Sequence, residues 1–171
     1  MARIPPHIIS TFSRYSLGGL GLATAYGVAG ATSLAWPAAN RALFIPLHVD
    51  ITFTIDKFIW DNRNSGTANA DIGLYSDTGT RLLSTGSVAL HGATGPQRTN
   101  VADYIVNPGR YYLAMAYAAT SSMLMAAFSV TRLAEMGVYE QSSALPLPAT
   151  ATFVAITTNS LPLAGIIPKY P

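Results

Sequence analysis

The sequence predicts an all-β protein: an antiparallel β-sandwich, jelly-roll-like, with an extended N-terminal arm and an extended C-terminal tail. Several short runs of residues alternate between apolar and polar side chains, and sequences typical of tight turns separate these runs. The sequence contains no convincing helical run. About six to eight short strands of this kind indicate a sandwich, although periodicity does not give the strand order.

We expect one folded domain between two extended ends: residues 1–35 form the arm, residues 36–160 the sandwich and residues 161–171 the tail. A chain of 171 residues suffices for one domain with a real core. Residues 17–35 are uncharged, but their five glycines disfavour a membrane-spanning helix, and three prolines favour an extended tail. We therefore predict no membrane span, and an arm that packs against a neighbour.

The first half of the sandwich begins with a short strand at residues 42–45, which Pro46 either ends or confines to a sheet edge. Residues 47–56 are the clearest strand, because apolar side chains occupy every second position. The alternation then changes phase, which predicts a bulge near Lys57. The composition of residues 61–66 is typical of a loop.

Two turn sequences predict hairpins. Ser76-Asp77-Thr78-Gly79 separates strands at residues 71–75 and 80–84, and Gly79 can adopt the left-handed conformation that the turn needs. Asn107-Pro108-Gly109 separates strands at residues 101–106 and 110–117, and Gly109 is expected to take the left-handed position of a second tight turn.

The strand after the second turn is apolar on both faces. Tyr111, Leu113, Met115 and Tyr117 share one face, whereas Tyr112, Ala114, Ala116 and Ala118 share the other. We expect one face to fill the core and the other to contact a second subunit. The alternative is that loops or the arm fold back over the second face within one chain.

The remaining chain gives weaker signals. We expect a turn at residues 119–122, then a strand to about Thr131 for which a short helix is the alternative, and irregular chain at residues 133–147. Further expectations are a short strand at residues 87–90, an open loop at residues 91–98 and a strand at residues 150–158.

Composition excludes several function classes. The net charge of +2 is spread along the chain without any run of like charge, so the clustered basic face that nucleic acid requires is absent. The chain has no cysteine and therefore no thiolate metal site, thiol nucleophile or disulfide. Only 11% of residues are charged, a surface that needs a covering partner, and we predict a homo-oligomer, most simply a trimer.

No catalytic, cofactor-binding or metal-binding residues are predicted, and we expect a protein that is not an enzyme. His48 and Asp50 lie on one strand face, but two ligands do not make a metal site, and His7 and His91 are distant in sequence. Asp56 is expected to be a solvated charge rather than half of an acid/base pair. Asp77 and Gly79 lack the further oxygen ligands of a calcium loop.

The chain is also rich in tyrosine, which gives a second class of hypothesis. Tyrosine rings on a sandwich face can stack on sugars, and they can equally serve core and interface packing. The tyrosines concerned are Tyr75, Tyr104, Tyr111, Tyr112 and Tyr117.

The run Trp36-Pro37-Ala38-Ala39-Asn40-Arg41 and later runs at residues 70–75, 81–87 and 108–116 resemble a group of small tailed-bacteriophage proteins described as virion or tail-associated structural proteins. The resemblance spans roughly half the chain. It implies a non-enzymatic component of the virion whose partners are other virion proteins, major capsid or tail and neck subunits. We expect a head-decoration or cement subunit held by extended arms. The alternative is a tail or neck appendage that binds host surface glycan.

Overall fold

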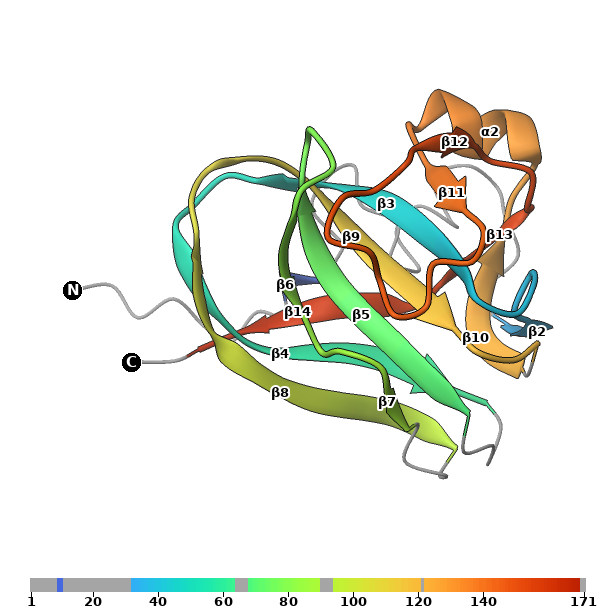
Figure 1. Cartoon of the computed structure of the whole chain (residues 1–171), viewed down its shortest axis with the longest axis horizontal. Helices are drawn as coiled ribbons and strands as arrows, with labels where there is room; N and C mark the ends of the chain where they lie inside the picture. Colours follow the sequence, from blue (N-terminus) through green and yellow to red (C-terminus); the bar gives the residue numbers. More distant parts are fainter. Residues whose placement is uncertain (1–8, 11–31, 64–67, 90–93, 121, 170–171) are drawn as a thin grey trace.

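The computed structural model describes residues 9–10, 32–63, 68–89, 94–120 and 122–169. Their strands form two antiparallel sheets of seven strands each, which pack face to face (Figure 1). The predicted fold class, an antiparallel β-sandwich, is therefore confirmed. Most of the predicted N-terminal arm lies outside the described residues.

The two sheets are called sheet A and sheet B. Sheet A contains β1 (Ile9–Ser10), β2 (Thr32–Ala35), β4 (Phe53–Asn62), β8 (Gly95–Val106), β10 (Ser122–Ala127), β13 (Ser160–Pro162) and β14 (Ala164–Pro168). Sheet B contains β3 (Arg41–Val49), β5 (Asn69–Ser76), β6 (Arg81–Ser84), β7 (Val88–Ala89), β9 (Gly109–Tyr117), β11 (Tyr139–Gln141) and β12 (Val154–Ala155).

One long two-stranded ribbon organises both sheets. The chain through β3 and β4 runs antiparallel to the chain through β8 and β9, with Val49 opposite Gly109 in sheet B and Phe53 opposite Val106 in sheet A. Between these two pairs both chains bend together from one sheet into the other, which Figure 1 shows at its left side. A ribbon folded over both layers in this way makes the sandwich jelly-roll-like.

The second predicted hairpin is wrong, because the Asn107-Pro108-Gly109 turn is the corner of this ribbon. β8 and β9 lie in different sheets, where β8 pairs with β4, and β9 pairs with β3 and β5. Gly109 is not among the left-handed residues. β8 and β9 separate at this turn because β8 follows β4 in sheet A and β9 follows β3 in sheet B, and β3 and β4 are joined at the same corner.

The same corner divides the predicted strand at residues 47–56. β3 ends at Val49, the exposed residues 50–52 turn the chain, and β4 begins at Phe53. β3 also passes through Pro46, whose free side is an edge because β11 pairs only with residues 42–44. The edge alternative for Pro46 is therefore confirmed, since no strand of the described residues pairs with Pro46 on that side.

Two local predictions are confirmed. The register between β4 and β8 shifts between Ile55 and Lys57, which is the predicted bulge. The first hairpin is formed by β5 and β6, and the Ser76 N–H donates a hydrogen bond to the Thr80 carbonyl over 2.8 Å. Gly79 closes this turn with a φ of +87°.

A short helix replaces the end of the strand predicted to reach Thr131. β10 ends at Ala127, and α2 (Val130–Glu135) begins after Ser129, whose hydroxyl accepts a hydrogen bond from the Arg132 N–H over 3.2 Å. A serine at this position favours a helix start over continued pairing. Among the described residues, no helix has the length and apolar character to cross a membrane.

Three other segments differ from expectation. β8 already begins at Gly95, within the predicted loop at residues 91–98, because residues 95–98 pair with β4. β11 pairs with β3 in a region predicted to be irregular, and the strand predicted at residues 150–158 is reduced to β12.

The sandwich also extends past both predicted domain boundaries. At the start, β2 pairs with β10, so residues 32–35 belong to sheet A rather than to a free arm. At the end, β14 pairs with β1 on one side and β4 on the other. The predicted tail at residues 161–171 therefore includes a strand of the sheet, because Ile166 is buried in the core and Pro162 and Pro168 stand at strand ends.

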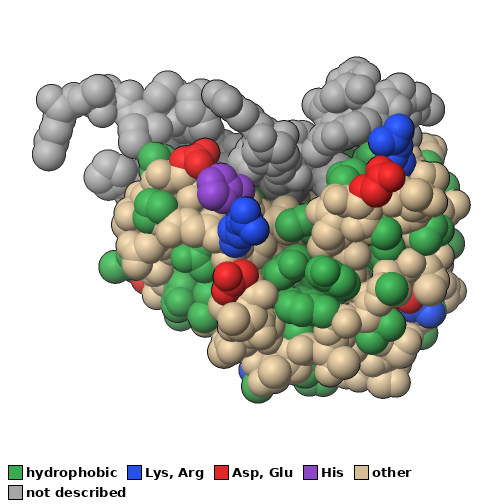
Figure 2. All heavy atoms as spheres, turned by 90° about the horizontal axis from the view of Figure 1, so that it is seen from above, with side chains coloured by type: hydrophobic (Ala, Val, Ile, Leu, Met, Phe, Trp, Pro, Cys, Tyr) green, Lys and Arg blue, Asp and Glu red, His purple; other side chains and the backbone are tan. Residues whose placement is uncertain are grey.

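Charged side chains are sparse on the surface. Figure 2 shows one face, where the few acidic and basic side chains lie in small mixed groups among hydrophobic and uncharged polar ones. In the described part of the chain, five basic side chains form ion pairs with carboxylates: Arg41, Lys57, Arg63, Arg132 and Lys169.

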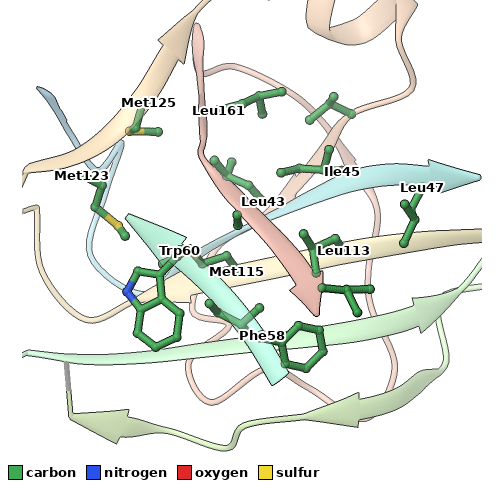
Figure 3. Close-up of a cluster of buried hydrophobic side chains, with 14 of the residues drawn as sticks. Leu43, Ile45, Leu47, Phe58, Trp60, Leu113, Met115, Met123, Met125 and Leu161 are labelled. Atoms are coloured by element: carbon green, nitrogen blue, oxygen red, sulfur yellow. The ribbon is translucent and has the colours of Figure 1, made fainter. Parts of the chain in front are cut away.

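The main core fills the space between the two sheets (Figure 3). Sheet B contributes the inward side chains of β3 and β9, and sheet A contributes large aromatic and sulfur-containing side chains. The labelled members are Leu43, Ile45, Leu47, Leu113 and Met115 from sheet B, and Phe58, Trp60, Met123, Met125 and Leu161 from sheet A. The inward face of β9 predicted from its alternation is thus confirmed.

Candidate functional site

A second apolar cluster covers the outer face of sheet B. Its other side is formed by residues 142–153, which we call the covering segment. The buried members are Ala42, Phe44, Tyr75, Ala114 and Ala116 from the sheet, and Ala144 and Leu147 from the covering segment. The second face of β9 is therefore covered within the chain, which is the predicted alternative to a subunit contact.

A buried carboxylate fastens the covering segment to the sheet. Asp71 on β5 accepts hydrogen bonds from the Leu147 N–H over 3.0 Å and from the Thr85 hydroxyl over 3.1 Å. Burial raises the pKa of Asp71 above its ordinary value, and these hydrogen bonds oppose the rise. Asp71 therefore links the covering segment and Thr85 to β5.

Three further hydrogen bonds join the covering segment to the β5–β6 hairpin. The Tyr75 hydroxyl donates to the Pro148 carbonyl over 2.6 Å. The Arg81 N–H donates to the Ala149 carbonyl over 2.9 Å, and the Ala151 N–H donates to the Gly79 carbonyl over 2.8 Å. The segment is thus fixed by polar contacts along its length.

The other buried acid has a similar structural role. Glu140 on β11 accepts hydrogen bonds from the Thr157 N–H over 3.1 Å and from the Thr157 hydroxyl over 2.7 Å, and it forms an ion pair with Arg41 over 3.3 Å. Both carboxylates that the described sandwich buries therefore bind backbone amides of neighbouring segments.

The covering segment buries the outer face of sheet B along only part of β3 and β9. Directly opposite residues of an antiparallel pair point to the same face, so the outward pairs follow each other as Ala42 and Ala116, Phe44 and Ala114, Pro46 and Tyr112, and His48 and Arg110. The first two pairs are buried beneath the covering segment. The last two pairs are the candidate site.

Three half-buried aromatic rings stand where the cover ends. The ring centroids of Tyr112 and Phe153 lie 4.6 Å apart, those of Tyr139 and Phe153 lie 5.1 Å apart, and those of Tyr112 and Tyr139 lie 6.0 Å apart. Because each ring packs against the other two, Tyr112 is held in place. Burial raises the pKa of Tyr112, and Tyr139 and Asp77 raise it further.

A groove of about 710 Å³ lies beside this aromatic group, and we call it the β3–β9 groove. The lining residues are Pro46, Leu47, His48, Asp77, Arg110, Tyr111, Tyr112, Met136 and Gly137. In Figure 2, acidic, basic and histidine side chains stand beside a patch of hydrophobic side chains on this face. The groove therefore joins an aromatic surface to polar groups of both charges.

The polar groups of the groove are exposed. His48 and Asp50 form a pair over 3.0 Å. Arg110 and Asp77 are also exposed, and neither forms an ion pair with another described residue. The guanidinium and the carboxylate are consequently available for a ligand.

The structure brings together only some of the residues considered from the sequence. His48 and Asp50 are neighbours, but Asp56 lies beyond the corner and pairs with Lys57. Within the described ranges, no three His, Asp or Glu side chains group as metal ligands, and His7 and His91 lie outside those ranges.

The five tyrosines do not form one platform. Tyr75 and Tyr117 are fully buried, and Tyr104 is half-buried on β8. Only Tyr111 and Tyr112 line the groove. Sequence reasoning missed Phe153, Tyr139 and Arg110, which no local pattern connects.

Comparisons with protein-family models, curated proteins and solved structures find no match to this chain.

Proposed function

We propose that this chain is a non-enzymatic structural subunit of a bacteriophage particle, most simply a head-decoration or cement protein bound to major capsid or other virion subunits. The observation that supports the proposal is the use of the two buried carboxylates, Asp71 and Glu140, as backbone anchors rather than as reactive groups. A sandwich stiffened in this way suits a protein whose role is to bind neighbours and bear load.

The arm is part of this proposal. Residues 17–31 are uncharged and lead directly into β2, which pairs with β10 and so gives the arm a fixed root on sheet A. An apolar, glycine-rich segment rooted at a sheet edge is suited to lie across a neighbouring subunit.

Removal of the arm tests the cement role. A chain that lacks residues 2–31 keeps β2 and loses from the described sheets only the two-residue strand β1, which pairs with β14. We expect this chain to fold, as judged by circular dichroism, but to leave phage particles undecorated in electron micrographs. The full-length chain is the control. Full decoration by the shortened chain would show that the arm has no such role.

We also propose that the chain forms a homo-oligomer, with a trimer as the simplest case. Support comes from the sparse surface charge and from two large apolar side chains near the corner, Ile51 and Ile105, which are 47% and 63% exposed. In light scattering, the double variant Ile51→Ser, Ile105→Ser is expected to have a lower molar mass than the wild-type oligomer. The matched control is Val154→Ser, which changes another exposed apolar side chain. A wild-type monomer would contradict the proposal.

A second candidate function is a tail or neck appendage that binds host surface glycan. The β3–β9 groove favours it, because an aromatic surface with polar groups of both charges suits a sugar. Imaging of labelled chain on particles separates the two candidates: a position on capsid facets supports the cement role, and a position on the tail or neck supports the appendage.

A further inference from the structure

We propose that the β3–β9 groove binds one neutral pyranose of a glycan, which stacks on Tyr112 and forms hydrogen bonds with Asp77 and Arg110. This inference rests on the second candidate function and deepens it by naming the ligand class and the residues. It does not depend on the position of the chain on a particle.

Size and shape are the first argument. Ligand sites in proteins have volumes of about 300–1,000 Å³, and the groove, at about 710 Å³, falls within this range. A pyranose with part of a second sugar fits such a space, and the open groove leaves room for the rest of a glycan chain.

The groove has a rigid aromatic floor, the ring of Tyr112. The ring of Tyr112 packs against the rings of Phe153 and Tyr139, so its orientation is fixed before a ligand arrives. The C–H face of a pyranose is weakly apolar and matches the face of such a ring. A floor that needs no rearrangement lowers the entropy lost on binding.

The groove carries both a carboxylate, from Asp77, and a guanidinium, from Arg110. Asp77 can only accept hydrogen bonds when ionised, whereas Arg110 can only donate them. A sugar hydroxyl both donates and accepts, so one pyranose can satisfy both side chains. An anionic sugar would gain from Arg110 but would be repelled by Asp77, which lines the same groove. The pair therefore favours a neutral ligand.

The test is saturation-transfer NMR and titration calorimetry on the full chain. The probes are three neutral oligosaccharides (maltotriose, mannotriose and lactose) and one anionic comparator, sialyllactose. We expect binding of at least one neutral probe, with the strongest transfer to its ring C–H protons, and weaker binding of sialyllactose.

Two variants locate the site. Arg110→Gln and Asp77→Asn change exposed side chains, so the fold is expected to persist, and each removes a hydrogen bond to a charged group. Affinity for the neutral probe is expected to fall about tenfold in each variant. The matched controls are Arg98→Gln and Asp103→Asn, which alter exposed charges on β8 in the other sheet and are expected to bind as wild type does.

Three results would overturn the proposal. Binding to none of the neutral probes rejects a sugar site in the groove. Preference for sialyllactose rejects the neutral ligand class. Neutral binding that Arg110→Gln and Asp77→Asn leave unchanged rejects the site, while the glycan-binding appendage itself would still stand.

Discussion

The main core and the outer cluster of this protein are both apolar, but they are built in different ways. In the main core both sides are formed mainly by strands, so backbone pairing positions most of the side chains. In the outer cluster, sheet B meets the irregular covering segment, which side-chain hydrogen bonds from Asp71 and Tyr75 hold in place. Burial of an apolar face outside a sandwich therefore depends here on a few polar anchors.

The largest expected effect comes from truncating one buried leucine in each cluster and comparing the losses in the free energy of unfolding. Leu113→Ala, in the main core, is expected to lower the free energy of unfolding by about 3 kcal/mol, because it leaves a cavity between two sheets. Leu147→Ala, in the covering segment, removes the same atoms from the outer cluster. Urea denaturation measures both losses.

Hydrogen exchange sharpens this first comparison. In Leu147→Ala, faster exchange is expected to be confined to the covering segment and its contacts on β5 and β6. In Leu113→Ala, exchange is expected to rise throughout both sheets. Equal acceleration of β4 in the two variants would show that the clusters unfold as one unit.

The next effect concerns the carboxylate that fastens the cover. Asp71→Ala leaves the buried Leu147 N–H without its acceptor, and we expect a loss of about 2 kcal/mol in the free energy of unfolding. Asp71→Asn is the matched control, because its amide oxygen can still accept that bond. Losses of equal size would indicate that the hydrogen bond contributes little.

The same residue predicts a pH dependence. Burial raises the pKa of Asp71 in the folded protein, so the folded state binds the proton more tightly than the unfolded state does. The stabilisation is fully present below the unfolded pKa and is lost as pH rises through the raised folded pKa. Relative to Asp71→Asn, wild type should therefore lose stability from about pH 3.5 upwards until Asp71 is ionised. Denaturation at a series of pH values measures this, and a rise instead of a fall would contradict it.

A smaller effect is expected at the turn beneath the cover. Gly79 and Gly86 both have positive φ, of +87° and +68°, so alanine at either position strains the backbone, with a loss of about 1 kcal/mol. Only at Gly79 would the new Cβ also approach the covering segment, at 3.3 Å from the Ala151 carbonyl oxygen and the Phe153 ring. Thermal unfolding is expected to show a larger loss for Gly79→Ala than for Gly86→Ala. Equal losses would mean that the covering segment yields to the methyl group.

The smallest expected change in the free energy of unfolding comes from removing a buried tyrosine hydroxyl, and two tyrosines allow a comparison. Tyr75→Phe removes the hydroxyl that donates to Pro148, and we expect a loss of about 1 kcal/mol. Tyr117→Phe, in the main core, removes a buried hydroxyl that has no hydrogen-bond partner among the described residues, and we expect no loss or a small gain. Urea denaturation of both variants checks the difference in sign. A loss in Tyr117→Phe as large as in Tyr75→Phe would contradict this account of the two hydroxyls.

The candidate site was only partly predictable. The alternation of residues 111–118 placed Tyr112 on the outward face, and His48 was also recognised as outward. The neighbours that complete the groove come from distant segments, namely Asp77 from the first turn and Met136 from the end of α2. Pairing of β3 with β9 and the path of the covering segment bring them together, and neither leaves a local pattern.

The sequence by itself determined the features that a few adjacent residues control: the Ser76 to Gly79 turn, the bulge near Lys57 and the two apolar faces of β9. Only the tertiary structure decided that the turn at Asn107 is a corner between sheets, and that the outer face of β9 is covered by its own chain. The physical reason is that a turn fixes the local direction of the chain, whereas strand pairing and burial depend on partners that lie far away in the sequence.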